Sequence, residues 1–110
     1  MSHLSKQYPQ LSVEIVEFVD DCQPGVVRAE FVDANGKQHS LIDKIYLFTS
    51  EFLDASSAYP VPGSARCEIL ERWRGSDANE LVRISIDRPD HIDSTEGLSE
   101  FVVGSTQLID

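Results

Sequence analysis

Turn-forming residues recur at short intervals along this chain, and they limit the length of every regular element that it can form. Pro-Gly, Asn-Gly and single Pro or Gly residues lie at positions 24–25, 35–36, 60–63, 75, 89 and 97. The runs between them are about 8 to 12 residues long and rich in Val, Ile, Phe and Tyr, as in small β-domains. No long apolar stripe with a helical period competes with this rhythm. We therefore expect an all-β fold, a small antiparallel barrel or sandwich of about five to seven short strands.

The first long run, LSVEIVEFVD at residues 11–20, fits two structures. Leu11, Val13 and Ile15 alternate, and the apolar positions then change phase, which a strand with a β-bulge would explain. The spacing of Leu11, Ile15 and Phe18 also fits one face of a helix. The β-branched residues favour the strand.

The run VVRAEFVDANGKQHSLI at residues 26–42 predicts a β-hairpin, because Asn and Gly accept the positive φ angles of a tight turn. A three-residue Ala-Asn-Gly loop would place Asp33 opposite Lys37 and Phe31 opposite His39. A two-residue loop would shift the register by one residue and move His39 to the other face. The pairing of opposite charges favours the three-residue loop.

The rest of the chain predicts further short strands separated by turns. We expect them at residues 45–49, 65–74, 81–87 and 100–104, and residues 107–109 could extend the last. In the run 81–87, Ile84 should point inward and Ser85 outward. The irregular stretch 50–63 could hold one helical turn near 50–55 before its prolines end it.

Four of these segments follow one another in a distinctive order. They read VRAEFVDANGK, PGSARCEILER, LVRISIDRP and EFVVG, and they span residues 26–104. Their order resembles that of the β-barrel domains of elongation factor Tu and its relatives, and this resemblance implies a small closed barrel. The family's Gly-rich arginine signature does not follow the closing strand, and the GTP-binding motif GxxxxGK[ST] does not occur. The resemblance therefore assigns no functional residue.

The charge of the chain narrows the choice of partner. Against 9 basic residues stand 19 acidic ones, a formal net charge of −10. Such a charge repels phosphate backbones and anionic membranes and attracts basic proteins. We therefore expect no nucleic acid and no membrane as partner, and a basic protein as the favoured one.

The remaining sequence features predict a single cytoplasmic domain over residues 1–110. The beginning, MSHLSKQYPQ, lacks the apolar core of a signal peptide, and residues 1–9 are expected to fray. No apolar run approaches the ~18 residues of a membrane span. Cys22 and Cys67 form neither a CxxC motif nor a zinc spacing, so we expect reduced, buried thiols.

The stretch RPDHIDSTEG at residues 88–97 looks more like a chemical site than any other. A calcium loop needs oxygen ligands at alternating positions around a central glycine, and zinc needs more nitrogen or sulfur ligands than one histidine. Neighbouring Asp, Ser and His in the sequence do not make a catalytic triad. We expect a polar turn without metal, cofactor or catalytic residue, and as the alternative a contact surface for a basic partner. Its candidate residues are Asp87, Asp90, His91, Asp93 and Glu96.

The tripeptide Arg72-Trp73-Arg74 is a second candidate contact. A half-buried Trp between two outward arginines would be the ordinary structural explanation. Trp and Arg also dominate the energetics of protein interfaces, and the net charge makes nucleic acid the less favoured ligand.

These features favour a non-catalytic protein-binding module, in its most concrete form an inhibitor or immunity-type protein directed against a cationic partner. No paired nucleophile and base can be named, so the sequence argues against an enzyme. The alternative is a small enzyme or ligand carrier that uses the interior of a barrel. The sequence does not predict an oligomeric state.

Overall fold

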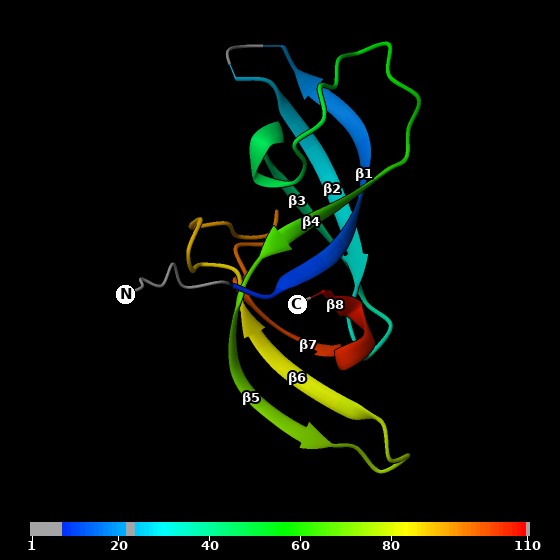
Figure 1. Cartoon of the computed structure of the whole chain (residues 1–110), viewed down its shortest axis with the longest axis vertical. Helices are drawn as coiled ribbons and strands as arrows, with labels where there is room; N and C mark the ends of the chain where they lie inside the picture. Colours follow the sequence, from blue (N-terminus) through cyan, green and yellow to red (C-terminus); the bar gives the residue numbers. More distant parts are fainter. Residues whose placement is uncertain (1–7, 22–23, 110) are drawn as a thin grey trace, which may run out of the picture.

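The structure is a computed structural model that describes residues 8–21 and 24–109. The fold is all-β, as predicted, and its strands form two antiparallel sheets (Figure 1). The strands are β1 (Gln10–Asp20), β2 (Val26–Val32), β3 (Gln38–Lys44), β4 (Val61–Arg66), β5 (Glu68–Arg74), β6 (Glu80–Ser85), β7 (Glu100–Gly104) and β8 (Leu108–Ile109). The 3-10 turns are η1 (Ile45–Leu47) and η2 (Ser105–Gln107). Over the described ranges, no helix has the length and apolar character needed to cross a membrane.

The first sheet has the strand order β3-β2-β1-β4, and β8 pairs with the beginning of β1. Residues 11–20 are strand and not helix. The register of β1 against β2 shifts between Ile15 and Glu17, and again between Phe18 and Asp20. These bulges explain why the apolar positions change phase in the sequence.

The hairpin of β2 and β3 has the predicted three-residue loop. Phe31 lies opposite His39, and the Asp33 amide donates to the Lys37 carbonyl at 2.9 Å. The Gly36 amide donates to the Asp33 carbonyl at 3.0 Å, and Gly36 has φ +84°. Both hydrogen bonds depend on the left-handed backbone at Gly36, which glycine adopts at little cost.

The second sheet has the strand order β5-β6-β7, and the chain enters it at Cys67. The prediction of one strand over 65–74 is therefore wrong: its first residues end β4 and the others form β5. Cys67 is fully buried, and its amide donates to the Pro9 carbonyl at 2.9 Å. Cys22 and most of the expected frayed terminus lie outside the described residues. The hairpin of β5 and β6 extends away from the first sheet (Figure 1), and β7 pairs with β6 from Leu81 to Ser85. We call this hairpin the arm.

Both sheets contribute to one hydrophobic core, but they do not close into a barrel. The closed barrel that the resemblance implies is thus not formed. The turn rhythm left a barrel and a sandwich open, and the structure excludes the closed barrel. Each sheet keeps two edge strands, β3 and β4 in the first and β5 and β7 in the second. The core side chains are Leu11, Val13, Ile15, Val27, Ala29, Phe31, Leu41, Phe48, Leu53, Ala65, Cys67, Val82, Ile84, Ile86, Ile92, Phe101 and Val103.

Three local predictions differ from the structure. Residues 45–49 are not a core strand. Lys44 pairs with Val26, the first residue of β2, so β2 offers no residue with which the chain beyond Lys44 could pair. The helical turn lies at 45–47 and not near 50–55. Ser85 is buried and does not face solvent, because the segment after β6 folds back over its end.

Candidate functional site

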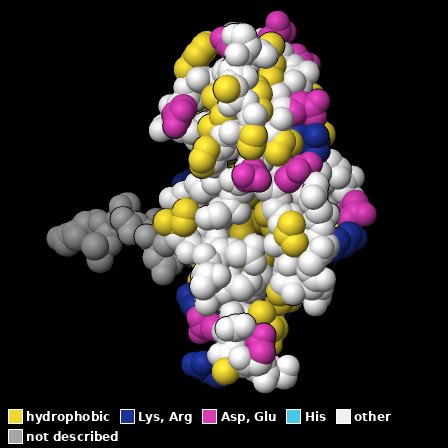
Figure 2. Space-filling view, turned by 90° about the vertical axis from the view of Figure 1, so that its right-hand side faces the viewer, with side chains coloured by type: hydrophobic (Ala, Val, Ile, Leu, Met, Phe, Trp, Pro, Cys, Tyr) yellow, Lys and Arg dark blue, Asp and Glu magenta, His cyan; other side chains and the backbone are white. Residues whose placement is uncertain are grey.

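Two aromatic side chains are the most exposed large apolar groups of the described surface. Phe52 is 86% exposed and Tyr46 is 63% exposed. Tyr46 comes from η1 and Phe52 from the loop that leads to β4, and both line a cleft of about 480 Å³. Hydrophobic side chains with acidic ones at their margin are visible on the upper half of the face in Figure 2. Exposed apolar side chains that gather around one cleft are typical of interaction sites, whereas singly scattered ones are ordinary surface features.

The lining of this cleft combines apolar and acidic side chains. Phe18, Ile45 and Leu53 lie beside the two aromatic residues, and the acidic members are Asp21, Glu51 and Asp54. No Lys, Arg or His belongs to the part of the lining that the structure describes. The cleft therefore presents apolar area inside a negative field. We call it the Phe52 cleft.

Hydrogen bonds hold the loop that carries Phe52. The Glu51 amide donates to Thr49 Oγ1 at 3.1 Å on one side of it. On the other side the Asp54 amide donates to Ser57 Oγ at 3.0 Å, and the Tyr59 hydroxyl donates to the Asp54 carbonyl at 2.8 Å. Phe52 is thus exposed on a fixed loop, so less conformational entropy would be lost when a partner covers it.

Other hydrogen bonds stabilise the charge of the Asp54 carboxylate. Its carboxylate accepts hydrogen bonds from the Ser56 hydroxyl at 2.8 Å and from the Ser56 amide at 2.9 Å. These bonds, the one from the hydroxyl first, lower the pKa of Asp54 below its ordinary value, because they stabilise the ionised form. The negative charge of this residue is therefore present throughout the neutral range.

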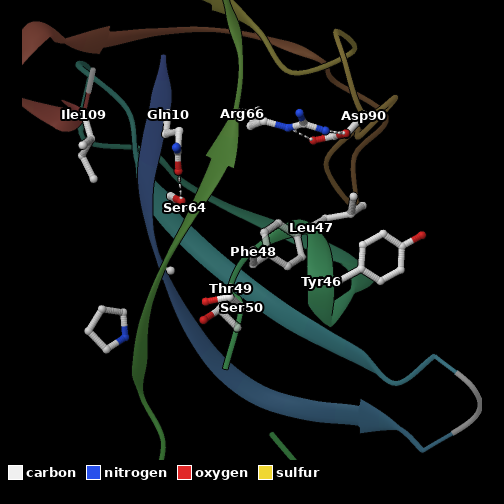
Figure 3. A pocket seen from close by; sticks show the side chains of 12 residues that line it. Gln10, Tyr46, Leu47, Phe48, Thr49, Ser50, Ser64, Arg66, Asp90 and Ile109 are labelled. Carbon is white, nitrogen blue, oxygen red and sulfur yellow. Dashed lines mark hydrogen bonds and ion pairs between the residues drawn. The ribbon is translucent and has the colours of Figure 1, made fainter. Parts of the chain in front are cut away.

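A second cleft of about 610 Å³ adjoins the first (Figure 3). At one end Arg66 binds both oxygens of Asp90, with Nε–Oδ2 at 3.1 Å and Nη2–Oδ1 at 2.6 Å. Phe48 forms part of its wall, and Ser64 donates a hydrogen bond to Gln10. We call it the Arg66 cleft.

Carboxylates are the commonest titratable groups in the described linings of the two clefts. Neither lining, over the described residues, contains a His, Cys or Lys that could serve as base or nucleophile. The Asp90 carboxylate is already occupied by Arg66. Across residues 8–21 and 24–109, no group of three or more His, Cys, Asp or Glu could hold a metal ion.

The residues predicted from RPDHIDSTEG have different surroundings. Asp90 turns toward Arg66 and only 8% of its side chain is exposed, whereas Glu96 forms an ion pair with Lys37 at 3.1 Å. His91 Nδ1 lies 3.5 Å from Asp87 Oδ1, and both side chains are exposed.

The loop is also anchored more firmly than a simple polar turn. Ile92 and Ser94 are buried, and Asp93 between them is exposed. The Thr95 amide donates to the Ser40 carbonyl at 2.9 Å, which ties the loop to β3.

The second predicted contact lies on the arm. Trp73 is 37% exposed and lies opposite Leu81. Arg72 forms an ion pair with Glu80 at 3.2 Å, and Arg74 Nη1 donates to the Ala78 carbonyl at 2.8 Å. Both arginines thus stabilise the arm itself.

The structure does not bring the two predicted contacts together. Arg74 pairs with Glu80 at the start of β6, and the acidic loop follows Ser85 at its end. The five residue steps between these ends correspond to about 17 Å of strand.

Sequence reasoning missed Tyr46 and Phe52. The apolar run 45–49 predicts a strand in the core and hence a covered Tyr46. The stretch 50–63 predicts only an irregular segment and says nothing of the exposure of Phe52. One signal was available: Phe52 is a large aromatic residue beside Glu51, in a segment that prolines keep out of regular structure.

Comparisons with protein-family models, with curated proteins and with solved structures find no match to this chain. They do not bear on the resemblance to the elongation factor Tu barrel domains, which stays an expectation.

Proposed function

We propose that this protein is a non-catalytic binding module that recognises a basic protein through Tyr46 and Phe52. The observation that carries the proposal is the exposure of Phe52 on a hydrogen-bonded loop among acidic side chains. Burying a side chain of this size contributes about 1.5–3 kcal/mol, and a fixed aromatic anchor is typical of interface hot spots.

The acidic residues supply the second part of recognition. Long-range attraction by a chain of net charge −10 raises the association rate of a cationic partner and disfavours acidic competitors. An inhibitor or immunity-type role against a cationic protein is the concrete form that we favour. The ligand carrier considered above depended on a barrel interior, and the two open sheets do not provide one.

Affinity capture with point variants tests the proposal. The immobilised protein is compared with Phe52→Ser, Tyr46→Ser and Trp73→Ser in low salt and in about 0.5 M salt, where exposed charges are screened beyond about 4–5 Å. We expect the wild type and Trp73→Ser to retain a basic protein in low salt, and high salt to release it. Phe52→Ser should bind this protein at least about tenfold more weakly.

The variants also locate the surface if the proposal is wrong. Since Phe52 and Tyr46 are exposed, their replacement should change the free energy of unfolding by no more than about 0.5 kcal/mol, so lost capture cannot be ascribed to unfolding. If capture depends on Trp73 and not on Phe52, the partner binds at the arm, where the sequence predicts the Trp73 contact. Capture of basic proteins that all three variants retain would contradict the proposal.

A further inference from the structure

The two clefts are parts of one groove. Tyr46, Thr49 and Ser50 line both of them, so the hollows meet at η1 and the residues that follow it. Tyr46 extends from η1 toward the open side in Figure 3. We call the combined feature, the Phe52 cleft together with the Arg66 cleft, the Tyr46 groove.

The charge of the groove favours a cationic occupant. Asp21, Glu51 and Asp54 line one end, and Asp90 lies at the other. Among the described lining residues Arg66 alone is cationic, and both oxygens of Asp90 already bind its guanidinium. A lysine or arginine of a partner would therefore meet uncompensated carboxylates, chiefly around the Phe52 cleft.

The shape of the groove favours a chain segment over a flat surface. Two hollows that meet at Tyr46, Thr49 and Ser50 are filled better by projecting side chains than by a planar protein face, and each lies in the size range of small-ligand sites. In an extended peptide, residues i and i+2 point to the same side about 6.5–7 Å apart, so neighbouring hollows can receive alternate side chains.

The backbone of β4 does not serve as the template for such a segment at the centre of the groove. The Ser64 amide, on the side of β4 away from β1, already donates to the Phe48 carbonyl at 2.9 Å. Added-strand pairing is thus blocked at this position, and recognition has to come from side chains.

From these observations we infer that the Tyr46 groove binds a short, extended, basic segment of the partner, with an apolar side chain in the Phe52 cleft. The inference rests on the proposed function and adds the form of the partner: a peptide-like segment that alternates basic and apolar residues.

Four synthetic heptapeptides test the inference without knowledge of the partner. The probe is KLKLKLK, in which the leucines on one side of an extended chain can enter the hollows while the long, flexible lysines reach back to the carboxylates at the margin. KLLKKLK has the same composition with the leucines at helical spacing, KSKSKSK keeps the charge without apolar groups, and ELELELE reverses the charge. Affinity is measured by fluorescence anisotropy, and the site is mapped by backbone amide NMR shifts.

We expect KLKLKLK to bind at least about tenfold more tightly than each of the other three, with amide shifts at 46–54, Ser64 and Arg66. Phe52→Ser should weaken this binding at least about tenfold. Ile42→Ser is the matched control, because it removes a side chain that is 45% exposed outside the groove. It should leave the affinity unchanged.

The outcomes separate the inference from the proposed function. If KSKSKSK binds as tightly as KLKLKLK, charge alone accounts for the attraction. If KLLKKLK binds as tightly, the groove does not require an extended peptide. Either result overturns the inference. If no peptide shifts the groove amides while partner capture still depends on Phe52, the partner docks as a folded surface, and only the inference falls. If capture does not depend on Tyr46 or Phe52, the proposed function falls, whatever the peptides do.

Discussion

His39 and Asp33 meet across the first hairpin, with His39 Nε2 at 2.7 Å from Asp33 Oδ2. The imidazole is 4% exposed and lies against the rings of Phe31 and Phe101, with centroid distances of 5.3 and 4.7 Å. The other oxygen of Asp33 accepts the amides of Asn35 at 2.8 Å and of Lys37 at 3.0 Å. One carboxylate therefore joins the turn to a buried polar group of the core.

Asp33→Asn should destabilise the protein, and the loss should depend on pH. Partial burial raises the pKa of Asp33, but hydrogen bonds from the His39 ring and from the Lys37 and Asn35 amides outweigh it and lower the pKa below its ordinary value. The ionised carboxylate thus stabilises the fold above the unfolded pKa of about 3.9, and this contribution is lost as the pH falls through the folded pKa.

Thermal unfolding followed by circular dichroism between pH 2.5 and 7 checks this prediction. Above about pH 5 we expect the variant to lose about 1–3 kcal/mol, and below about pH 4 we expect the difference from the wild type to shrink. Asp93→Asn, which removes an exposed carboxylate, is the control and should show a much smaller difference. A constant difference down to pH 2.5 would contradict the assignment of the effect to Asp33 ionisation.

Replacements of Gly36 should cost stability through the backbone alone. Its φ is +84°, and a Cβ at this position would meet no atom within 4 Å. Gly36→Val should lose about 1–3 kcal/mol, Gly36→Ala less, and Gly36→Asn least, because Asn tolerates the left-handed region. Chemical denaturation midpoints give the order, with Ala34→Ser as a neutral control. A Gly36→Val midpoint equal to that of the wild type would rule out the strain explanation.

Ala78→Gly should have the opposite effect. The second hairpin repeats the hydrogen bonds of the first, with Gly75 N to Asn79 O at 2.8 Å and Ala78 N to Gly75 O at 3.0 Å. Ala78 occupies the left-handed position there, at φ 69°. Removing its Cβ should relieve more strain than the added unfolded-state entropy costs, with a net gain of up to about 1 kcal/mol. A lowered denaturation midpoint would show that Ala78 is not strained in solution.

Arg66→Met should destabilise the protein because it leaves the Asp90 carboxylate, of which 8% is exposed, without its partner. The loss should be about 1–3 kcal/mol in urea unfolding. Arg66→Lys should recover part of it, since Lys keeps the charge but not the two-pronged geometry. In a double-mutant cycle with Asp90→Asn, a coupling energy near zero would mean that the pair contributes nothing.

The sequence by itself determined the local structure and the charge. Alternation is a property of neighbouring residues, so the strands at 11–20, 26–32 and 100–104 could be recognised before any partner strand was known. The turn residues predicted the correct register at His39. The charge pair that favoured this register is not the one formed, because Asp33 binds His39 and Lys37 pairs with Glu96. The net charge of −10 needs no structure at all.

Only the tertiary structure decided which strands pair and which side chains are covered. Ala65 and Cys67 are both buried, as they would be in one continuous strand. The apolar pattern therefore does not reveal that the chain passes from the first sheet to the second at Cys67. Strand β3 ends where its partner β2 begins, at the pair of Lys44 with Val26. Tyr46 therefore lies on the surface, although its apolar neighbours in the sequence resemble a core strand. The exposure of Phe52 likewise depends on residues that are distant in the sequence, and so does the ion pair of Arg66 with Asp90. Such contacts are set by the packing of the whole chain, and no local pattern encodes them.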